Sequence, residues 1–581
     1  LENGKMSSNH NLGSNSPSGE IEHISHLSNN IGTLFLNDEY SDVILVVEGE
    51  KFHSHKAILA SRSDYFRALL FGGMKESSQS EIELKSTPLK GFEFLLKYIY
   101  TGHMSLSSLK EDVILDILTL ANQYGFLDLE LAISEYLEAI LKIKNVCMIF
   151  DVASLYQHQH LQSVCYTFMD LHAPDVIGHE TFYNLSPPAL KKIISRDSFC
   201  APEEDIFKAV CEWHKANPGH DASSILEEIR LSLMDINCLL NVVRPTNLVS
   251  SDCILDAIKT KTESRDMDLN YRGYLIVDEN MAQAKYGAQV LAGEMKKSLL
   301  DGDTTNYDME RGFTRHPIDD GNGILIELGM QCIINHIKML LWDRDPRSYS
   351  YCIEVSNDQE DWVRIIDHTK FHCRSWQYLY FHPRVVKYIK ILGTYNTVNR
   401  VFHVVSVEAF FTSKLFEISD GLFVPKANVA TIGMHASVIE GVSRTRNALL
   451  NGDTKNYNWD NGYTCHQLGS GAIVLQLAQP YMLSSLRLLL WDCDDRSYSY
   501  YIESSVNYTN WKMLVDKTKE PCRSWQTVYF DPCPVVYLRI VGTNNTANEV
   551  FHCVHFECPA QVNSELLTTN NTQLRLQEEE R

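Results

Sequence analysis

Long apolar runs and a surplus of basic residues are both missing from the sequence. No stretch approaches the roughly 18 consecutive apolar residues that a membrane-spanning helix needs. The 52 Lys and Arg residues are outnumbered by 74 Asp and Glu residues, which gives a formal net charge of −22. Nucleic acids and anionic membranes bind basic surfaces, because both carry negative charge. We therefore expect no nucleic acid and no membrane as main partner, which leaves proteins or small molecules.

Paired cysteines, a leader segment and catalytic motifs are also missing. The 15 Cys residues are odd in number and scattered, which is typical of reduced thiols in packed interiors. The N-terminal segment is rich in Asn, Ser and Gly rather than apolar, which predicts no signal peptide and a location in the cytosol or nucleus, of which we favour the cytoplasm. The motifs G-x-x-x-x-G-K-[ST], G-x-S-x-G and H-E-x-x-H do not occur. We expect a protein that is not an enzyme and needs no cofactor.

The C-terminal half contains a duplication. The run LLDGDTTNYD from Leu299 recurs as LLNGDTKNYN from Leu449, and the run around Trp342 recurs around Trp491, 149 residues later (491 − 342). A period this long that occurs twice indicates duplicated whole domains. Each copy contains short runs rich in β-branched and aromatic residues, separated by Gly, Asn, Asp and Pro, which is typical of strands. Each copy is therefore predicted to form an all-β sandwich or jelly roll.

The N-terminal half changes from a strand pattern to a helix pattern. A strand-like run over 42–47 returns over 51–56 after a short turn, which predicts a hairpin. After it, apolar residues recur at helical spacing, as in Phe92, Leu95 and Ile99, and this period continues toward the repeat without strands. The sequence thus predicts a multidomain chain: a mixed α/β domain, an all-α domain and two all-β domains.

Specific runs in these segments resemble known domain families. The run SDVILVVEGEKFHSHKAILASRSDYFRALLFGGMKES from Ser41 resembles the BTB/POZ family, and the helical stretch from Asn145 resembles the BACK domain that follows BTB in cullin adaptors. The paired β units, with LLDGDT and ILGT in one copy and LLNGDT and IVGT in the other, resemble discoidin-type (F5/8 type C) jelly rolls. The predicted boundaries are a disordered N-terminus (1–22), a BTB/POZ domain (23–141), a BACK domain (142–262), two discoidin-like jelly rolls (270–415 and 420–560) and a disordered tail (561–581).

The BTB resemblance implies a homodimer that docks a cullin-3 type scaffold. Asp42 and Lys56 match a buried polar pair at the BTB dimer seam. A hydrophobic-x-Glu motif docks the cullin in such domains, and Met74, Lys75 and Glu76 stand at its position. Methionine can fill an irregular pocket while the glutamate adds an orienting charge. Alternatives stay open, because Asp42 is also a strand-end acid beside a helix N-terminus and Met74 is also a helix-capping core residue.

Each jelly roll carries a loop that combines an aromatic, an acidic and a basic residue. These residues are Trp342, Asp343 and Arg347 in the first copy and Trp491, Asp492 and Arg496 in the second. Tryptophan and arginine are frequent anchors of binding surfaces, so the pattern indicates a ligand-binding rim. Because both copies keep the set, a salt-bridged turn with the Trp packed inside explains it equally well. Positions that differ, such as Arg315 against Cys465, are then better candidates for divergent binding.

Two turns and one strand hold possible metal ligands. The turns contain Asp301 and Asp303 in one copy and Asp453 in the other, and some carbohydrate-binding jelly rolls that these domains resemble hold calcium near such a loop. The spacing does not match an EF-hand, and Asx turns explain the same residues, so calcium is a weak hypothesis. Four His and Cys residues within 552–558 could bind zinc on a loop, but a strand places them on two faces, and we expect no metal there.

The domain order predicts a substrate adaptor of a cullin-3 type ubiquitin ligase. On this hypothesis the BTB domain dimerises and docks the cullin, the BACK domain sets the reach, and the jelly rolls recruit an unknown protein substrate. Tethering raises the effective concentration of the substrate, so ubiquitin transfer needs no catalytic residue in this chain. Two alternatives stay open: a dimeric scaffold or regulator, which the resemblance also links to nervous-system regulation, and a ligand-binding lectin or lipid-binding module.

Overall fold

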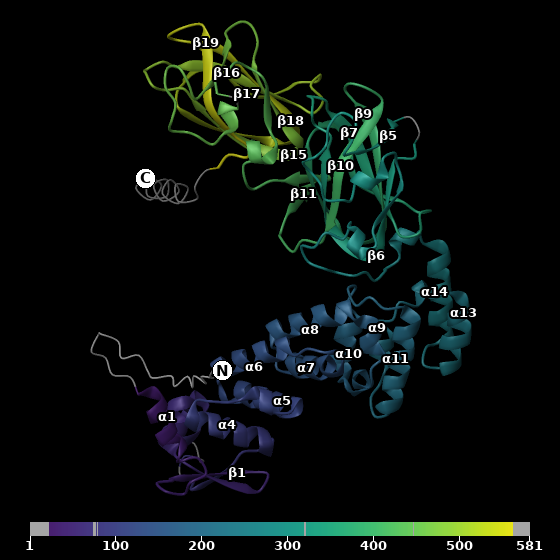
Figure 1. The fold of residues 1–581 in the computed structure, drawn as a ribbon, viewed down its shortest axis with the longest axis vertical. Helices are drawn as coiled ribbons and strands as arrows, with labels where there is room; N and C mark the ends of the chain where they lie inside the picture. Colours follow the sequence, from purple (N-terminus) through teal and green to yellow (C-terminus); the bar gives the residue numbers. More distant parts are fainter. Residues whose placement is uncertain (1–22, 74–76, 78, 319–320, 446, 562–581) are drawn as a thin grey trace, which may run out of the picture. The chain divides into compact units, whose positions relative to one another are not determined.

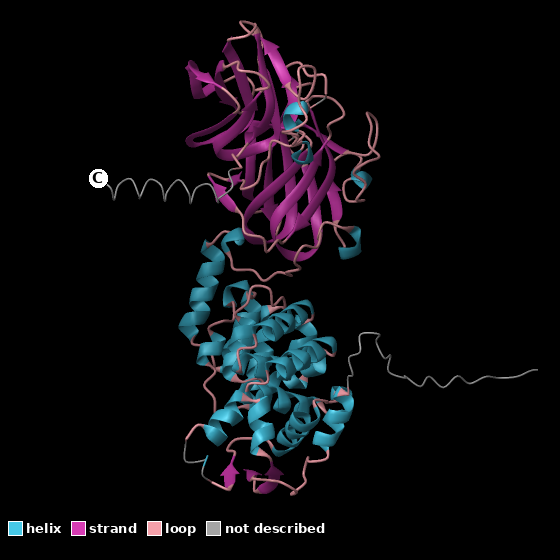
Figure 2. Ribbon diagram, turned by 90° about the vertical axis from the view of Figure 1, so that its left-hand side faces the viewer, coloured by secondary structure: helices cyan, strands magenta, loops and turns pink. Residues whose placement is uncertain are grey.

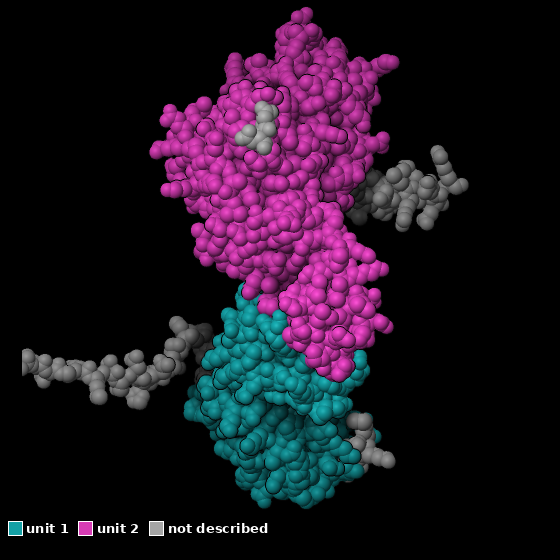
Figure 3. All heavy atoms as spheres, turned by 90° about the vertical axis from the view of Figure 1, so that its right-hand side faces the viewer, with its two compact units in different colours: residues 1–195, 204–229 teal, residues 196–203, 230–581 magenta. Residues whose placement is uncertain are grey.

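The computed structural model describes residues 23–73, 77, 79–318, 321–445 and 447–561. The two segments predicted to be disordered, 1–22 and 561–581, lie outside these residues apart from residue 561. The chain divides into two units, which Figure 3 colours separately. The first unit comprises Leu1–Ser195 and Glu204–Ile229, and the second comprises Arg196–Glu203 and Arg230–Arg581.

A three-stranded sheet forms the N-terminal part of the first unit (Figure 1). Its strand β1 (Val43–Val47) pairs antiparallel with β2 (Glu50–Ser54) and parallel with β3 (Glu81–Glu83). Alternate residues of β1 are buried, because successive side chains of a strand point to opposite faces. Gly49 has φ +88° in the turn between β1 and β2, a conformation that glycine adopts without strain. The predicted hairpin is confirmed.

Helices build the rest of the first unit (Figure 2). They are α1 (Ile24–Gly32), α2 (Lys56–Arg62), α3 (Asp64–Phe71), α4 (Leu89–Thr101), α5 (Glu111–Tyr124), α6 (Leu127–Ala139), α7 (Ile143–Leu155), α8 (Gln159–Leu171), α9 (Ala173–Ile177), α10 (Pro187–Ile194), α11 (Glu203–Ala216) and α12 (Ser223–Leu226). In α4 the side chains of Phe92, Leu95 and Ile99 are buried, because residues three and four apart share one face. The helices that follow α6 carry no strand between them in the described part of this unit, which confirms the all-α region. No described helix of the chain has the length and apolar character needed to cross a membrane.

Two seven-stranded sheets with the same topology form most of the second unit. The first contains β4 (Gln289–Ala292), β5 (Thr314–Pro317), β6 (Ile324–Leu341), β7 (Tyr349–Ser356), β8 (Val363–Cys373), β9 (Trp376–Asn396) and β10 (Val401–Phe410). The second contains β13 (Ser437–Glu440), β14 (Thr464–Gln467), β15 (Ile473–Leu490), β16 (Tyr498–Ser505), β17 (Lys512–Cys522), β18 (Trp525–Asn545) and β19 (Val550–Glu557). The orders are β5-β10-β6-β9-β7-β8 with β4 on β6, and β14-β19-β15-β18-β16-β17 with β13 on β15. The equal orders confirm the duplicated jelly rolls.

Short elements complete the second unit. They are the hairpin of β11 (Glu417–Ser419) and β12 (Leu422–Val424), which connects the jelly rolls, and the helices α13 (Ile236–Cys238) and α14 (Ser251–Glu263). Within each jelly roll the two longest strands pair with each other. In the second copy these are β15 and β18, whose pairing register shifts between Gln476 and Tyr481 and again between Leu483 and Ser485. Such bulges bend a strand, so that one strand contributes to both halves of the sandwich.

Hydrogen bonds join the two jelly rolls of the second unit, where β15 lies beside β9 (Figure 1) and also contacts β8. The bulge of β15 supplies Gln479, whose side-chain carbonyl accepts the backbone N–H of Tyr378 (2.5 Å) and whose amide donates to the Tyr378 carbonyl (2.9 Å). The side-chain amide of Gln377 donates to the carbonyl of Ala478 (2.8 Å). Both glutamines are buried, and buried amides need hydrogen-bond partners. Each jelly roll therefore satisfies polar groups of the other.

A buried ion pair lies in the second unit just before the first jelly roll. The Arg272 Nε donates to Glu203 Oε1 (2.5 Å), and the two side chains are only 3% and 5% exposed. Arg272 Nη1 also donates to the carbonyl of Arg196 (2.8 Å), and Glu203 Oε2 accepts the backbone N–H of Arg230 (3.1 Å). Each buried charge thus has both an opposite charge and a backbone partner, which burial of a charge requires.

Candidate interaction sites

The predicted dimer-seam residues lie where the N-terminal sheet meets α2. The carboxylate of Asp42, just before β1, accepts a hydrogen bond from the backbone N–H of Lys56, the first residue of α2 (2.7 Å). The Lys56 Nζ donates to the carbonyl of Ser77 (3.3 Å). Asp42 is exposed and Lys56 is half-buried in the single chain, so burial of the pair requires a second chain. The contact of Asp42 with the start of α2 agrees with the strand-end alternative.

The predicted cullin-docking motif, Met74, Lys75 and Glu76, lies outside the described residues. Directly before it, α3 ends at Phe71, whose side chain is 62% exposed. An exposed phenylalanine beside a predicted docking motif offers further apolar contact area to a partner. The sequence pattern did not single out Phe71, because its apolar character is that of a core residue and only the helix geometry places it in solvent.

The predicted ligand rim of the second jelly roll is an internally paired turn. Trp491 is 1% exposed, and the Arg496 guanidinium stacks on its ring (4.3 Å to the centroid). Arg496 also donates two hydrogen bonds to Asp494 (both 2.7 Å), and this pairing lowers the pKa of the Asp494 carboxyl to about 2. Asp492 accepts a hydrogen bond from the Tyr457 hydroxyl (2.6 Å). The polar groups of this turn therefore serve the fold.

The first jelly roll repeats this arrangement. Trp342 is 2% exposed, and Arg347 stacks on it (4.4 Å to the centroid) while it donates two hydrogen bonds to Asp345 (2.8 and 2.6 Å). Asp343 accepts the Tyr307 hydroxyl (2.6 Å). The geometry in both copies agrees with the salt-bridged turn that the sequence offered as the alternative. Ligand binding by these six rim residues stays a prediction.

Two equivalent histidines lie beneath the rims. His403 in β10 and His552 in β19 are buried, and a ring nitrogen of each lies within hydrogen-bond distance of the Tyr349 and Tyr498 hydroxyls (3.3 and 3.2 Å). Burial lowers the pKa of each imidazole from 6.5 to about 4, and a nearby arginine adds to the effect. Both histidines are therefore neutral in the folded protein at neutral pH.

We expect the jelly rolls to lose stability as the pH falls from 6.5 to about 4. In this window the unfolded chain binds a proton at each of these histidines and the folded chain does not, so the free energy of unfolding falls with pH. The loss is about 2 kcal/mol for each histidine after solvent screening. Urea unfolding at several pH values, followed by Trp fluorescence, measures it. His552→Gln should flatten the pH dependence, and an unchanged slope in this variant contradicts the assignment.

The weak calcium candidates form Asx turns. Asp301 accepts the backbone N–H of Asp303 (2.8 Å), and Asn451 accepts that of Asp453 (2.8 Å). The backbone N–H groups of Asn306 and Thr305 hold the pKa of Asp303 well below its usual range. Within the described ranges no three His, Cys, Asp or Glu side chains group as a metal site would require. The Asx-turn alternative accounts for these carboxylates, and calcium stays an untested hypothesis.

The position that differs between the copies, Arg315 against Cys465, changes the surface chemistry. In the first copy Arg315 forms a salt bridge with Glu294 (2.7 Å). In the second copy the equivalent backbone β-bridge joins Cys465 to Val442, which is 68% exposed. An exposed ion pair is thus replaced by a thiol and an apolar side chain, so the two jelly rolls present different surfaces near their rims.

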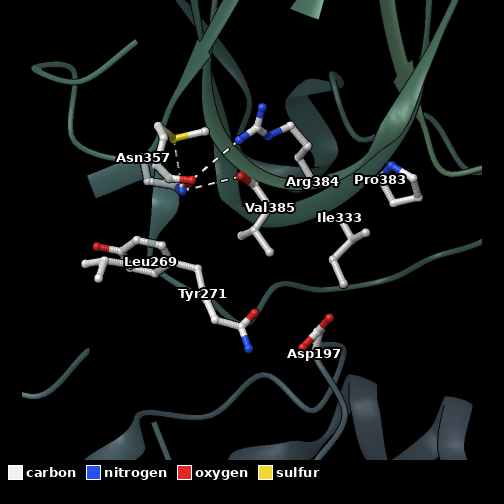
Figure 4. A pocket seen from close by; sticks show the side chains of 10 residues that line it. Asp197, Leu269, Tyr271, Ile333, Asn357, Pro383, Arg384 and Val385 are labelled. Carbon is white, nitrogen blue, oxygen red and sulfur yellow. Dashed lines mark hydrogen bonds between the residues drawn. The ribbon is translucent and has the colours of Figure 1, made fainter. Parts of the chain in front are cut away.

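A polar hollow of about 200 Å³ lies in the second unit, where the segment after α14 meets the first jelly roll (Figure 4). Asn357 donates to the carbonyl of Val385 (3.3 Å), and Arg384 donates to the carbonyl of Met267 (3.4 Å), as the dashed lines in Figure 4 show. Met267 itself packs into the core of the jelly roll. The hydrogen bonds in the wall of this hollow attach the incoming segment to the β-domain.

The comparisons with known families define the class of this protein. A BTB/POZ domain model matches residues 31–141, a "BTB And C-terminal Kelch" (BACK) model matches 146–244, and an F5/8 type C domain model matches 435–556. The first jelly roll has the same strand order as the second. The molecule is thus a BTB–BACK protein with two discoidin-type domains. The matched domain families are adaptor-like and are not enzyme families.

Sequence identity to individual relatives shows the family within this class to which the chain belongs. BTB/POZ domain-containing protein 9 of Homo sapiens is 60% identical over 563 residues, which cover 96% of this chain and 92% of that protein. Its Drosophila melanogaster counterpart is 54% identical over 536 residues, which cover 92% and 74%. The chain belongs to the family of BTB/POZ domain-containing protein 9. Kelch-like protein 26 of Homo sapiens is 29% identical over 236 residues, 40% of this chain and 38% of that protein.

Proposed function

We propose that this protein is a substrate adaptor of a cullin-3 type ubiquitin ligase, acting as a homodimer in the cytoplasm. The BTB domain dimerises and docks the cullin through Met74, Lys75 and Glu76, and the jelly rolls recruit a protein substrate. Transfer is then promoted because the substrate and the charged ubiquitin carrier are held in one complex, which raises their effective concentration.

The observation that carries this proposal is the domain order. BTB and BACK models match consecutive segments, 31–141 and 146–244, and the chain is 29% identical to Kelch-like protein 26 of Homo sapiens over 236 residues. Here the duplicated jelly rolls follow these two domains and form most of the second unit. An adaptor needs one end for the scaffold and another for the substrate, and this order provides both.

Co-purification with a cullin-3 scaffold tests the docking assignment. Glu76→Arg should reduce the recovered cullin at least tenfold, because reversing an orienting charge in an interface costs more than 1.4 kcal/mol. Met74→Ala should weaken recovery as well, because it removes an apolar anchor. Glu50→Arg is the matched control, since it reverses an exposed charge at the start of β2.

Unchanged cullin recovery in both docking variants overturns the assignment of Met74 and Glu76. If the wild-type chain dimerises but recovers no cullin at all, the dimeric scaffold is the remaining function. Sedimentation of the same preparations distinguishes these outcomes, because it reports the dimer independently of the cullin.

A further inference from the structure

The face of the second jelly roll that points away from its core cluster carries a row of side chains that crosses five strands, and one of them, Val474, is fully buried. Glu440 of β13 lies opposite Val474 of β15, which lies opposite Arg539 of β18. Arg539 lies opposite Glu503 of β16, and Glu503 lies opposite Met513 of β17. Directly opposed residues share one face of a sheet. We call these five residues the cross-strand row.

A cavity of about 600 Å³ opens beside this row. Its wall includes Glu440, Tyr501, Arg539 and Val541, together with the glycine-rich turn 469–471. The two glycines of this turn have φ +76°, a conformation that glycine adopts without strain, and they add no side chain to the cavity wall. Cavities that bind ligands combine apolar walls with a few placed polar groups, and this one has both.

The charged residues of the row differ in whether they have a partner of opposite charge. Arg539 donates two hydrogen bonds to Glu503 (2.8 and 2.6 Å) and stacks on Trp511 (4.1 Å to the centroid), so its charge is neutralised. Glu440 is exposed, and among the described residues its carboxylate accepts only the Tyr508 hydroxyl (3.3 Å) and forms no ion pair. The Tyr508 ring is 43% exposed beside it. The row thus offers one uncompensated carboxylate next to an exposed aromatic ring.

The first jelly roll provides an internal comparison. In the same register its row consists of Ala292, Leu325, Lys390, Glu354 and Arg364. That row contains two basic residues and one acidic residue, whereas the second contains two acidic residues and one basic residue. The net charge of the row therefore changes from +1 to −1 between the copies.

Aromatic residues change along with the charge. Tyr501 stands where the first copy has Cys352, and Tyr508 stands where it has Gln359. The last two positions are structurally equivalent, because both residues have a positive φ (63° and 69°) in the same turn. At these three positions the second copy therefore carries a carboxylate and two tyrosines that the first copy lacks, which is the combination that attracts a cationic side chain.

We propose that the face formed by Glu440, Tyr501 and Tyr508 binds a basic segment of a partner protein. A Lys or Arg side chain enters the cavity, forms an ion pair with Glu440 and contacts the tyrosine rings. Binding itself does not depend on a cullin; only the conclusion that the segment belongs to a recruited substrate rests on the proposed function. An acidic or phosphorylated segment does not suit this face, because Arg539 already pairs with Glu503.

Fluorescence anisotropy with the full chain and a labelled peptide of Lys, Arg and Gly tests the proposal. The wild type should bind this peptide and not a peptide in which Glu replaces the basic residues. Glu440→Gln/Tyr508→Gln should weaken binding about tenfold, because it removes an ion pair and a cation–π contact. Asp531→Asn/Tyr529→Gln is the matched control, since it removes one exposed carboxylate and one exposed tyrosine from β18 of the same domain.

Equal loss of affinity in both double variants overturns the proposal, because it means that the overall negative charge attracts the peptide. Absence of binding by the wild type overturns it as well. If the double variant fails to fold, Glu440→Lys replaces it, and retained affinity in that variant is equally contradictory. Cullin recovery by the same variants is measured in parallel, so that failure of this site is distinguished from failure of the adaptor function.

Discussion

Replacing Arg272 by Ala is expected to lower the free energy of unfolding of the second unit by about 3–5 kcal/mol. The variant leaves the Glu203 carboxylate 5% exposed without its counter-charge. Removing a charge from water without a partner costs far more than an exposed ion pair contributes. Glu203→Ala should have a similar effect, because it leaves the buried Arg272 guanidinium without its counter-charge.

Urea unfolding followed by Trp fluorescence measures this loss, since of the eight Trp residues only Trp213 lies outside the second unit. Arg265→Ala is the control. Arg265 forms a salt bridge with Asp361, and its side chain is 57% exposed, so its removal should leave the unfolding transition nearly unchanged. Equal midpoints for Arg272→Ala and Arg265→Ala would show that the buried pair has no special role.

Replacing Trp491 by Ala is expected to cost about 3–5 kcal/mol, the usual range for a large buried aromatic residue. Trp491 packs with Leu489 and Val554 and donates its indole N–H to the carbonyl of Asn458 (2.9 Å). Truncation also removes the ring on which Arg496 stacks. The variant should therefore unfold at lower urea concentration than the wild type.

The control for this variant is Trp459→Ala, which removes a ring that contacts Trp491 (4.6 Å between centroids) but is 61% exposed. Its effect on stability should stay within about 1 kcal/mol. If Trp491→Ala instead keeps full stability and loses capture of a protein ligand, the rim is a binding site rather than a turn that serves the fold.

Much of the architecture could be predicted from the sequence, because it depends on local patterns. The hairpin at Gly49 and the helix face of Phe92 follow from spacing within a few residues, and the two β-domains follow from direct comparison of Trp342 with Trp491. The domain boundaries drawn from the same patterns stay predictions.

The surface of the second jelly roll could not be predicted in this way. Glu440, Arg539 and Glu503 are far apart in the chain and become neighbours only through strand pairing. A shift of one residue in pairing reverses the face of every side chain, and the bulges of β15 introduce such shifts. The hydrogen-bond partners of the rim residues could not be predicted from the sequence for the same reason, since Tyr457 and Asp492 lie in two different loops that only the fold brings together.

The reciprocal bonds between Gln479 and Tyr378 have a consequence for any partner that contacts both jelly rolls. These hydrogen bonds join the backbone of β9 to the bulge of β15. They therefore restrict rotation of one jelly roll relative to the other. A partner must present two epitopes at a spacing fixed by the joint. For such a partner, the joint sets the distance between its two contact points, in addition to the chemistry of each surface.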